Sequence, residues 1–345
     1  MKYTTLPNTN IEVSKICLGT MTFEEQNTEA EGHAQMDLAL EKGINFFDTA
    51  EMYSVPGRKE TYGSTEKIIG TWFKKTGKRD KVILASKIAG PNPGLAYIRE
   101  NMDFSPASIA LSIEKSLTRL QTDYIDLYQL HWPERKTNFF GQRGFKVQND
   151  GWEDNIYTVL ETLERCIKEG KIRNIGVSNE TPWGIMRFLE ESKYHNLPKI
   201  KTIQNPYSLL NRLFENGSAE IAIRENVGLL AYSPLAFGVL TGKFLTGESH
   251  PKARLTLFPQ FSRYNSAQCA QATKLYQEIA HQNGLSLTQM ALAFVNQQPF
   301  VTSNIIGATN LIQLEENIDS INVVLSETIL KEIDKVQSAI PDPAP

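Results

Sequence analysis

The chain has 345 residues, which is within the range of one large α/β domain. Hydrophobic residues make up 41% and charged residues 22%, a globular balance that argues against disorder. The formal net charge of −3 lacks the basic excess of nucleic-acid-binding proteins, so we expect no nucleic-acid partner.

Neither a signal peptide nor a membrane span is predicted. The N-terminal residues MKYTTLPNTN contain no apolar core of a secretion signal, and no run of about 18 apolar residues follows. Cys17, Cys166 and Cys269 are too few and too scattered for a disulfide framework or a zinc site. We therefore expect a cytoplasmic protein with buried, reduced thiols.

The chain begins with a predicted hairpin over residues 2–15, which turns at Asn8-Thr9-Asn10. Eight short apolar runs follow, most of them ending in a polar residue and succeeded by a helical segment. Such runs are typical of parallel strands that are covered on both faces. The predicted strands are Ile16–Leu18, Ile44–Phe47, Val82–Ser86, Ile125–Leu130, Ile172–Val177, Ile200–Ile203, Leu229–Tyr232 and Asn304–Ile306.

Helical segments can be recognised between these strands. Ser105 followed by Pro106 is an N-cap signal, and a helix is predicted over Ile156–Lys168, before Gly170. Strands that alternate with helices form right-handed βαβ units, and eight units close into a (β/α)₈ TIM barrel of residues 1–345. A doubly wound open sheet is the rival fold, but its dinucleotide-binding form would need a GxGxxG motif after the first strand, which is missing.

Two long loops interrupt the repeat, over residues 133–154 after the fourth strand and 236–266 after the seventh. In a barrel the loops that follow strands lie on the catalytic face. Aromatic residues in the first loop favour an apolar or aromatic ligand; they are Phe139, Phe140, Phe145 and Trp152.

Four residues near the ends of three consecutive strands have complementary chemistry. Tyr53 is a weak acid whose pKa a neighbouring Lys87 ammonium should lower, and Asp48 could hold that lysine charged and in place. His131 could donate to a carbonyl oxygen of a substrate. Taken singly, these residues are more often a helix cap, a solvated rim lysine or a structural histidine. Together they predict proton donation to a carbonyl group, whose hydride only a nicotinamide cofactor could supply.

Ordered motifs give the chain a resemblance to the aldo-keto reductase family, and within it to the bacterial Tas-like reductases and the potassium-channel β-subunit group. They include LGTMTF at 18–23, GINFFDTAEMY at 43–53, DLYQLHWP at 126–133, GKIRNIGVSN at 170–179 and AYSPLAFGVLTGKF at 231–244. The resemblance implies the barrel, NADPH-dependent reduction of aldehydes or ketones, and Tyr53 as the proton donor. It also implies a substrate site at Met52, Tyr53 and Trp132.

The same resemblance implies a cofactor site. Ser178, Asn179 and Gln204 would bind the nicotinamide carboxamide, and Tyr232 would stack on its ring. The other implied cofactor residues are Gly19, Thr20, Met21, Asp48, Ser233, Pro234, Leu235, Gly238, Leu240, Gly242, Lys243, Arg254, Ile306, Gly307, Thr309, Gln313, Glu316 and Asn317.

One departure concerns the cofactor's 2′-phosphate. Many family members carry a Lys-Ser pair and a later arginine for it, where this chain has Gly307, Ala308 and Gln313. Lys243 and Arg254 are the basic residues left for that phosphate, and cations there favour NADPH over NADH.

Two other functions remain open at this stage. The channel-subunit likeness permits a regulatory protein that binds NADP(H) with little turnover, although no protein partner can be identified. A metal-dependent hydrolase is disfavoured because the five histidines show no paired ligand spacing, and no metal site is predicted.

Overall fold

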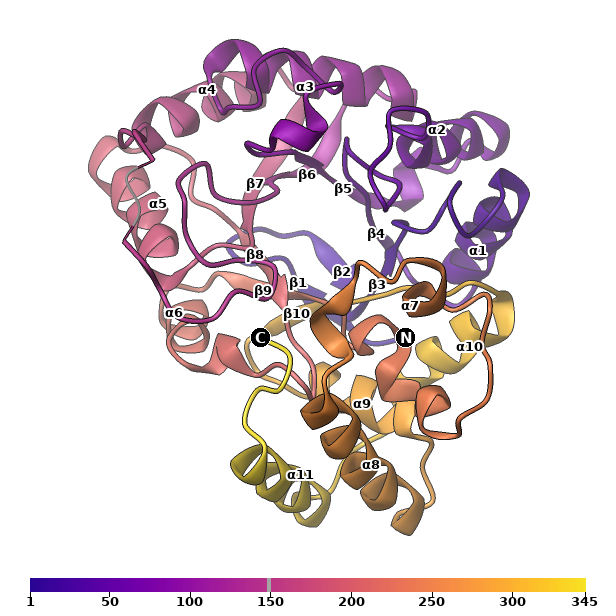
Figure 1. Ribbon diagram of the computed structural model, residues 1–345. Coiled ribbons are helices and arrows are strands. Elements are labelled where there is room, and N and C mark those ends of the chain that lie inside the picture. The colour runs from indigo at the N-terminus through magenta and orange to yellow at the C-terminus, as the bar shows by residue number, and fades with distance from the viewer. Residues whose placement is uncertain (148–149) are drawn as a thin grey trace.

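The computed structural model describes residues 1–147 and 150–345 and contains a closed barrel of eight parallel strands surrounded by helices (Figure 1). The barrel confirms the predicted (β/α)₈ fold and excludes the open sheet. Around the barrel the order is β10-β3-β4-β5-β6-β7-β8-β9, with each strand parallel to both neighbours. The strands are β3 (Ile16–Gly19), β4 (Phe46–Asp48), β5 (Ile83–Ile88), β6 (Ile125–Leu130), β7 (Ile172–Ser178), β8 (Thr202–Pro206), β9 (Gly228–Tyr232) and β10 (Val301–Ile306).

The surrounding helices begin where the sequence supplies capping side chains. At Ser105, for example, the hydroxyl accepts the Ser108 backbone N–H and proline follows, so one unpaired amide is satisfied and the next is absent. The predicted helix over Ile156–Lys168 is confirmed as α4. The other helices are α1 (Glu29–Glu41), α2 (Ser64–Thr76), α3 (Pro106–Leu120), α5 (Pro182–His195), α6 (Ser218–Arg224), α7 (Arg254–Leu257), α8 (Ala267–Gln282), α9 (Leu287–Asn296), α10 (Leu311–Asp319) and α11 (Glu327–Ala339).

Alternation along the strands divides the apolar residues between two cores. Phe47 packs outward in the large core between strands and helices, whereas Phe46 points into the barrel. The interior core also contains Ala85, Leu127 and Leu230. Because the period is two, Asp48 and Lys87 face inward like Phe46 and Ala85, one level nearer the carboxyl ends of the strands.

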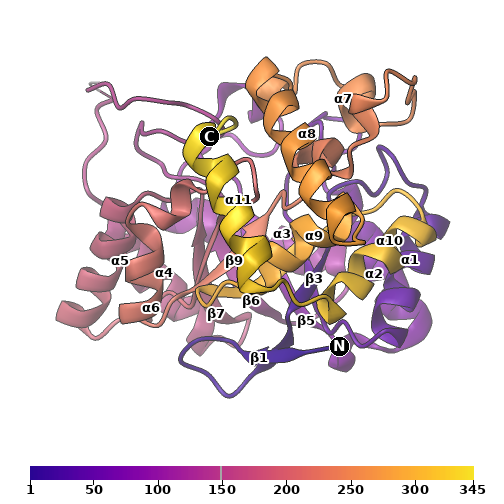
Figure 2. The ribbon, with the colours of Figure 1, turned by 90° about the horizontal axis from the view of Figure 1, so that it is seen from below.

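The predicted hairpin closes the other end of the barrel. Its strands β1 (Tyr3–Thr5) and β2 (Glu12–Ser14) are antiparallel. Leu6 and Val13 are fully buried in the interior core beside Cys17 and Phe46. Figure 2 shows the hairpin at the bottom of the molecule, while α7 and the C-terminal end lie at the top. The hairpin therefore forms an apolar floor beneath the interior core.

Several strand bounds differ from the sequence prediction by one to three residues. The second barrel strand begins at Phe46 rather than Ile44, because Asn45 is bonded to the hairpin: its Oδ1 accepts from Ser14 N at 2.7 Å and its Nδ2 donates to the Glu12 carbonyl at 2.9 Å. The loop after the seventh barrel strand is not irregular throughout, since it contains α7 and three short 3₁₀ segments. Of the loop over 133–154, residues 148–149 lie outside the described residues.

The three cysteines are buried and form no disulfide. Across the described part of the chain, no helix combines the length and the apolar content needed to cross a bilayer.

Candidate active site

A buried ion pair lies at the centre of the candidate site. The fully buried Lys87 ammonium donates to Asp48 Oδ2 and to the Thr49 carbonyl, both at 2.7 Å. The Tyr53 hydroxyl lies 3.5 Å from the same Nζ. The structure therefore brings together three of the four predicted catalytic side chains, with the lysine between the carboxylate and the phenol.

The second oxygen of Asp48 is fixed by two glutamines. Asp48 Oδ1 accepts from Gln204 Nε2 at 2.8 Å and from Gln129 Nε2 at 3.3 Å, and Gln204 Nε2 also donates to Gln129 Oε1 at 3.2 Å. Gln129 was missed by the sequence reasoning. It stands two residues before His131 in β6, and that spacing places it on the inward face. The two amides prevent the carboxylate from turning away from Lys87.

Burial changes the expected titration of Tyr53. Burial raises the pKa of Tyr53, and the nearby Lys87 lowers it by less, so the net shift is upward. Lys87 does lower this pKa, as the sequence led us to expect, but burial outweighs its effect. For Lys87, burial lowers the pKa, but Asp48 and Tyr53 together raise it further, and the lysine stays charged. A protonated phenol thus faces a fixed ammonium group.

His131 is held neutral beside this pair. Burial, followed by the charge of Lys87, keeps the pKa of His131 well below its usual range. Its ring stands edge-on to Tyr53, with the ring centroids 5.6 Å apart, and its buried Nδ1 has no hydrogen-bond partner. A neutral imidazole can donate a single N–H to a carbonyl oxygen, as its predicted role requires.

These groups open into one pocket of about 1530 Å³ on the loop face of the barrel. The volume exceeds the 300–1,000 Å³ usual for one small ligand, so a dinucleotide and a substrate could bind together. Lys87 lies behind the wall, Leu240 is buried in the core, and Gly242 also stands outside the lining. The predicted residues that line the pocket are Gly19, Thr20, Met21, Asp48, Met52, Tyr53, His131, Trp132, Ser178, Asn179, Gln204, Tyr232, Ser233, Pro234, Leu235, Gly238, Lys243, Arg254, Ile306, Gly307, Thr309, Gln313, Glu316 and Asn317.

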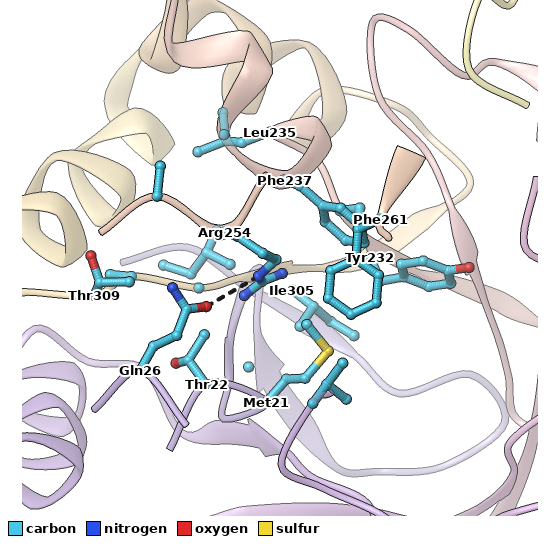
Figure 3. A pocket seen from close by; sticks show the side chains of 18 of the residues that line it. Met21, Thr22, Gln26, Tyr232, Leu235, Phe237, Arg254, Phe261, Ile305 and Thr309 are labelled. Carbon is cyan, nitrogen blue, oxygen red and sulfur yellow. Dashed lines mark hydrogen bonds between the residues drawn. The ribbon is translucent and has the colours of Figure 1, made fainter. Parts of the chain in front are cut away.

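Two cations on one side of the pocket lack acidic partners. Within the described residues, neither Lys243 nor Arg254 forms an ion pair; Arg254 Nε donates to Gln26 Oε1 at 3.3 Å (Figure 3). Burial lowers the pKa of Arg254 to about 10, and burial together with Arg254 lowers that of Lys243. A Cβ on Gly238 would meet Lys243 Nζ at 3.0 Å, so the glycine leaves room for the ammonium. Partly desolvated, unpaired cations suit a phosphate-bearing ligand.

A second cluster of polar side chains lies at the end of β7. Asn179 Nδ2 donates to the His131 carbonyl at 2.9 Å, and Asn179 Oδ1 accepts from the Tyr232 hydroxyl at 2.6 Å. The Ser178 hydroxyl donates to the Gln204 carbonyl at 2.7 Å. These bonds join β7 to β6, β8 and β9 and hold the Tyr232 ring in the pocket wall, where it offers a flat face to a ring of a ligand.

The pocket's far end has polar residues from α10 and the turn before it. Gln313 Oε1 accepts from the Thr309 backbone and hydroxyl, both at 3.0 Å, and Asn317 Nδ2 donates to the Gly307 carbonyl at 3.1 Å. Glu316 accepts from Ser286, a lining residue that the sequence did not reveal. The predicted cofactor residues at 307–317 are therefore mutually positioned.

Among the four aromatic residues noted in the loop over 133–154, Phe140 alone lines the main pocket. Its ring packs against that of Trp132, with centroids 5.8 Å apart. Phe145 is exposed, and Trp152 faces Trp183 in a smaller neighbouring cavity. The sequence composition of this loop could not show which aromatic rings turn inward.

The comparisons agree with this arrangement. The family model described as "Aldo/keto reductase family" matches residues 15–338. Protein tas of Escherichia coli (strain K12) is 50% identical over 346 residues, covering 100% of both chains. An uncharacterized oxidoreductase, YrpG, of Bacillus subtilis is 34% identical over 97% of this chain and 96% of its own. An aldo-keto reductase of Schizosaccharomyces pombe, whose name includes NADP(+), is 28% identical over 92% of this chain and 85% of its own.

The chain belongs to the aldo/keto reductase family. Membership makes it an oxidoreductase of the carbonyl-reducing class.

Proposed function

We propose that this protein reduces an aldehyde or ketone to the alcohol with NADPH, and that Tyr53 gives the proton. The observation that supports this most directly is the burial of a protonated Tyr53 hydroxyl beside the Lys87 ammonium, at 3.5 Å. A bound nicotinamide cofactor would supply the hydride to the carbonyl carbon.

The side chains divide the remaining work. His131, kept neutral, would donate to the carbonyl oxygen and orient it toward Tyr53. As charge develops on that oxygen, the Tyr53 hydroxyl would release its proton, and Lys87 would stabilise the resulting phenolate. Asp48 would hold Lys87 in its charged form, while Met52 and Trp132 would form the walls around the substrate.

Several observations favour NADPH as the cofactor. Lys243 and Arg254 provide cations without acidic partners for its phosphates, and the name of the Schizosaccharomyces pombe relative includes NADP(+). The unpaired buried thiols also support a reducing, cytoplasmic setting for the reaction.

The Tyr53→Phe variant provides the test. It removes only the hydroxyl, so NADPH consumption with an activated aromatic aldehyde should fall by about 10²–10⁴ while NADPH binding changes little. Tyr157→Phe is the matched control, because Tyr157 is an exposed residue of α4 far from the pocket. Full turnover by Tyr53→Phe would refute the proposed role. Tight NADPH binding without turnover of any carbonyl by the wild type would favour the regulatory alternative.

A further inference from the structure

Arg263 is a pocket residue that the proposed chemistry does not use. It lies on the 3₁₀ segment Ser262–Tyr264, in the loop after β9, and it lines the pocket together with Phe140 and Gly141 from the loop after β6. Its guanidinium carbon is 5.9 Å from the Phe140 ring centroid and 5.8 Å from that of Tyr264. Two loops that are far apart in sequence thus meet around one positive charge.

Within the described residues, no carboxylate lies within ion-pair distance of Arg263. Several other partly or fully buried arginines do have carboxylate partners: Arg99 pairs with Glu51, Arg119 with Glu66 and Arg135 with Glu180. A half-buried guanidinium loses hydration, and an anion normally compensates for that loss. The Tyr232 and Tyr264 phenols neighbour Arg263 within the protein, and a ligand in the pocket would supply the anion.

Arg263 belongs to a different part of the pocket from Lys243 and Arg254, the two cations proposed to bind the cofactor phosphates. It acts electrostatically on the Tyr232 phenol, whose pKa burial raises to about 12 against the opposing effect of Arg263. In Figure 3 the Tyr232 hydroxyl points away from Arg254. The two guanidinium groups therefore stand toward opposite ends of the Tyr232 ring.

A continuous aromatic wall connects Arg263 to the proton donor. Ring centroids are 5.6 Å apart for Tyr53 and His131, 4.9 Å for His131 and Trp132, and 5.8 Å for Trp132 and Phe140. The Arg263 guanidinium follows Phe140 in this series. A ligand with its carbonyl group at Tyr53 could therefore lie along Trp132 and Phe140 and reach Arg263 with its other end.

We propose that the substrate is an anionic carbonyl compound: an aldehyde or ketone whose aromatic or apolar middle carries a carboxylate or similar planar oxyanion, bound by Arg263. The inference rests on the proposed reductase function and names its substrate class. A guanidinium group binds such an oxyanion through two parallel hydrogen bonds, which an uncharged ester cannot match.

The test compares 4-carboxybenzaldehyde with methyl 4-formylbenzoate, which share the ring and the reacting group but differ in charge. For each protein we take the ratio of kcat/KM for the acid to kcat/KM for the ester. This ratio should be about tenfold to a hundredfold larger in the wild type than in Arg263→Gln, the range expected for hydrogen bonds to charged groups. Using the ratio between the two proteins cancels the different intrinsic reactivities of the two aldehydes. The loss should appear in KM for the acid, and Arg263→Lys should restore part of it.

The control variant is Arg143→Gln. Arg143 is an exposed residue of the loop after β6 that bonds to the Asp342 carbonyl and does not line the pocket. Its removal should leave the acid-to-ester ratio unchanged. Both variants remove one positive charge from a long loop on the same face of the barrel, so a general electrostatic effect would move both together and would overturn the proposal.

Binding separates this inference from the proposed function. Calorimetric titration of both aldehydes into the protein with NADP⁺ present should show tighter binding of the acid, lost in Arg263→Gln, whether or not turnover occurs. Equal affinities for acid and ester in the wild type would overturn the inference. So would an Arg263→Gln variant that keeps the preference, or one that weakens NADPH binding alone.

Discussion

Replacing Asp48 by asparagine should leave a buried charge without its partner. The Asp48 carboxylate accepts from Lys87 through one oxygen and from Gln204 and Gln129 through the other. Asparagine has only one acceptor oxygen, so its amide group must face either the ammonium or the two glutamine amides. Either orientation places donor against donor in a region from which water is excluded.

The expected magnitude follows from the burial of the pair. Lys87 and Asp48 side chains are 0% and 4% exposed, and their atoms are 2.7 Å apart. Removing one partner of such a pair costs about 3–5 kcal/mol in the free energy of unfolding. Asp48→Asn combined with Lys87→Met should recover much of that loss, because the double variant leaves no uncompensated charge. Asp80→Asn, which breaks an exposed pair with Lys81, should cost about 1 kcal/mol or less.

Urea unfolding measured at several pH values checks this reasoning. In the wild type, the folded-state pKa of Lys87 lies above its ordinary value, so its contribution is complete below pH 10.5 and is lost as the pH rises through the folded pKa. In Asp48→Asn, burial acts without Asp48 and the pKa of Lys87 should fall below 10.5. The unfolding free energy of the variant should then increase with pH on the alkaline side. The reasoning would be refuted if Asp48→Asn lost no more unfolding free energy than Asp80→Asn and the double variant recovered none of it.

Two further predictions concern His131 and Arg254. The folded protein keeps His131 neutral, whereas in the unfolded chain it takes up a proton near pH 6.5. The unfolding free energy of the wild type should therefore fall as the pH drops below 6.5, by up to about 1.4 kcal/mol per pH unit. In acid titrations His131→Gln should show a shallower decline, and equal slopes for the two proteins would contradict the assignment. Arg254→Gln should raise KM for NADPH by about tenfold or more and change KM for NADH much less, as one charge-assisted phosphate contact requires. An equal rise for both cofactors in steady-state kinetics would place Arg254 away from the 2′-phosphate.

The fold could be predicted because each strand shows its burial in its own residues. Runs such as Leu229–Tyr232 are apolar on both faces, which parallel strands under helices require, and polar residues follow where the strands end. The same regularity located Asp48, Lys87 and His131, since the carboxyl ends of barrel strands meet at one face. Local patterns were sufficient wherever position along a strand determines position in space.

Features that depend on contacts between distant segments could not be predicted. Asn45 looks like part of a strand, but its side chain bonds to the hairpin more than 30 residues away. The upward shift of the Tyr53 pKa depends on how completely the folded chain excludes water. Arg263 resembles any loop cation until the two long loops meet around it. Gln129 is the exception, because period-two alternation from His131 was enough to find it.

The N-terminal hairpin closes one end of the barrel to solvent, which limits the routes by which protons can reach the site. Leu6 and Val13, packed on Cys17 and Phe46, separate Lys87 from solvent at the base of the barrel. In the proposed reaction, any proton that Tyr53 gave away would therefore have to be replaced through the loop face, the same opening that admits ligands. A substrate lodged in that opening would block resupply until the product leaves, so each binding event would carry a single proton.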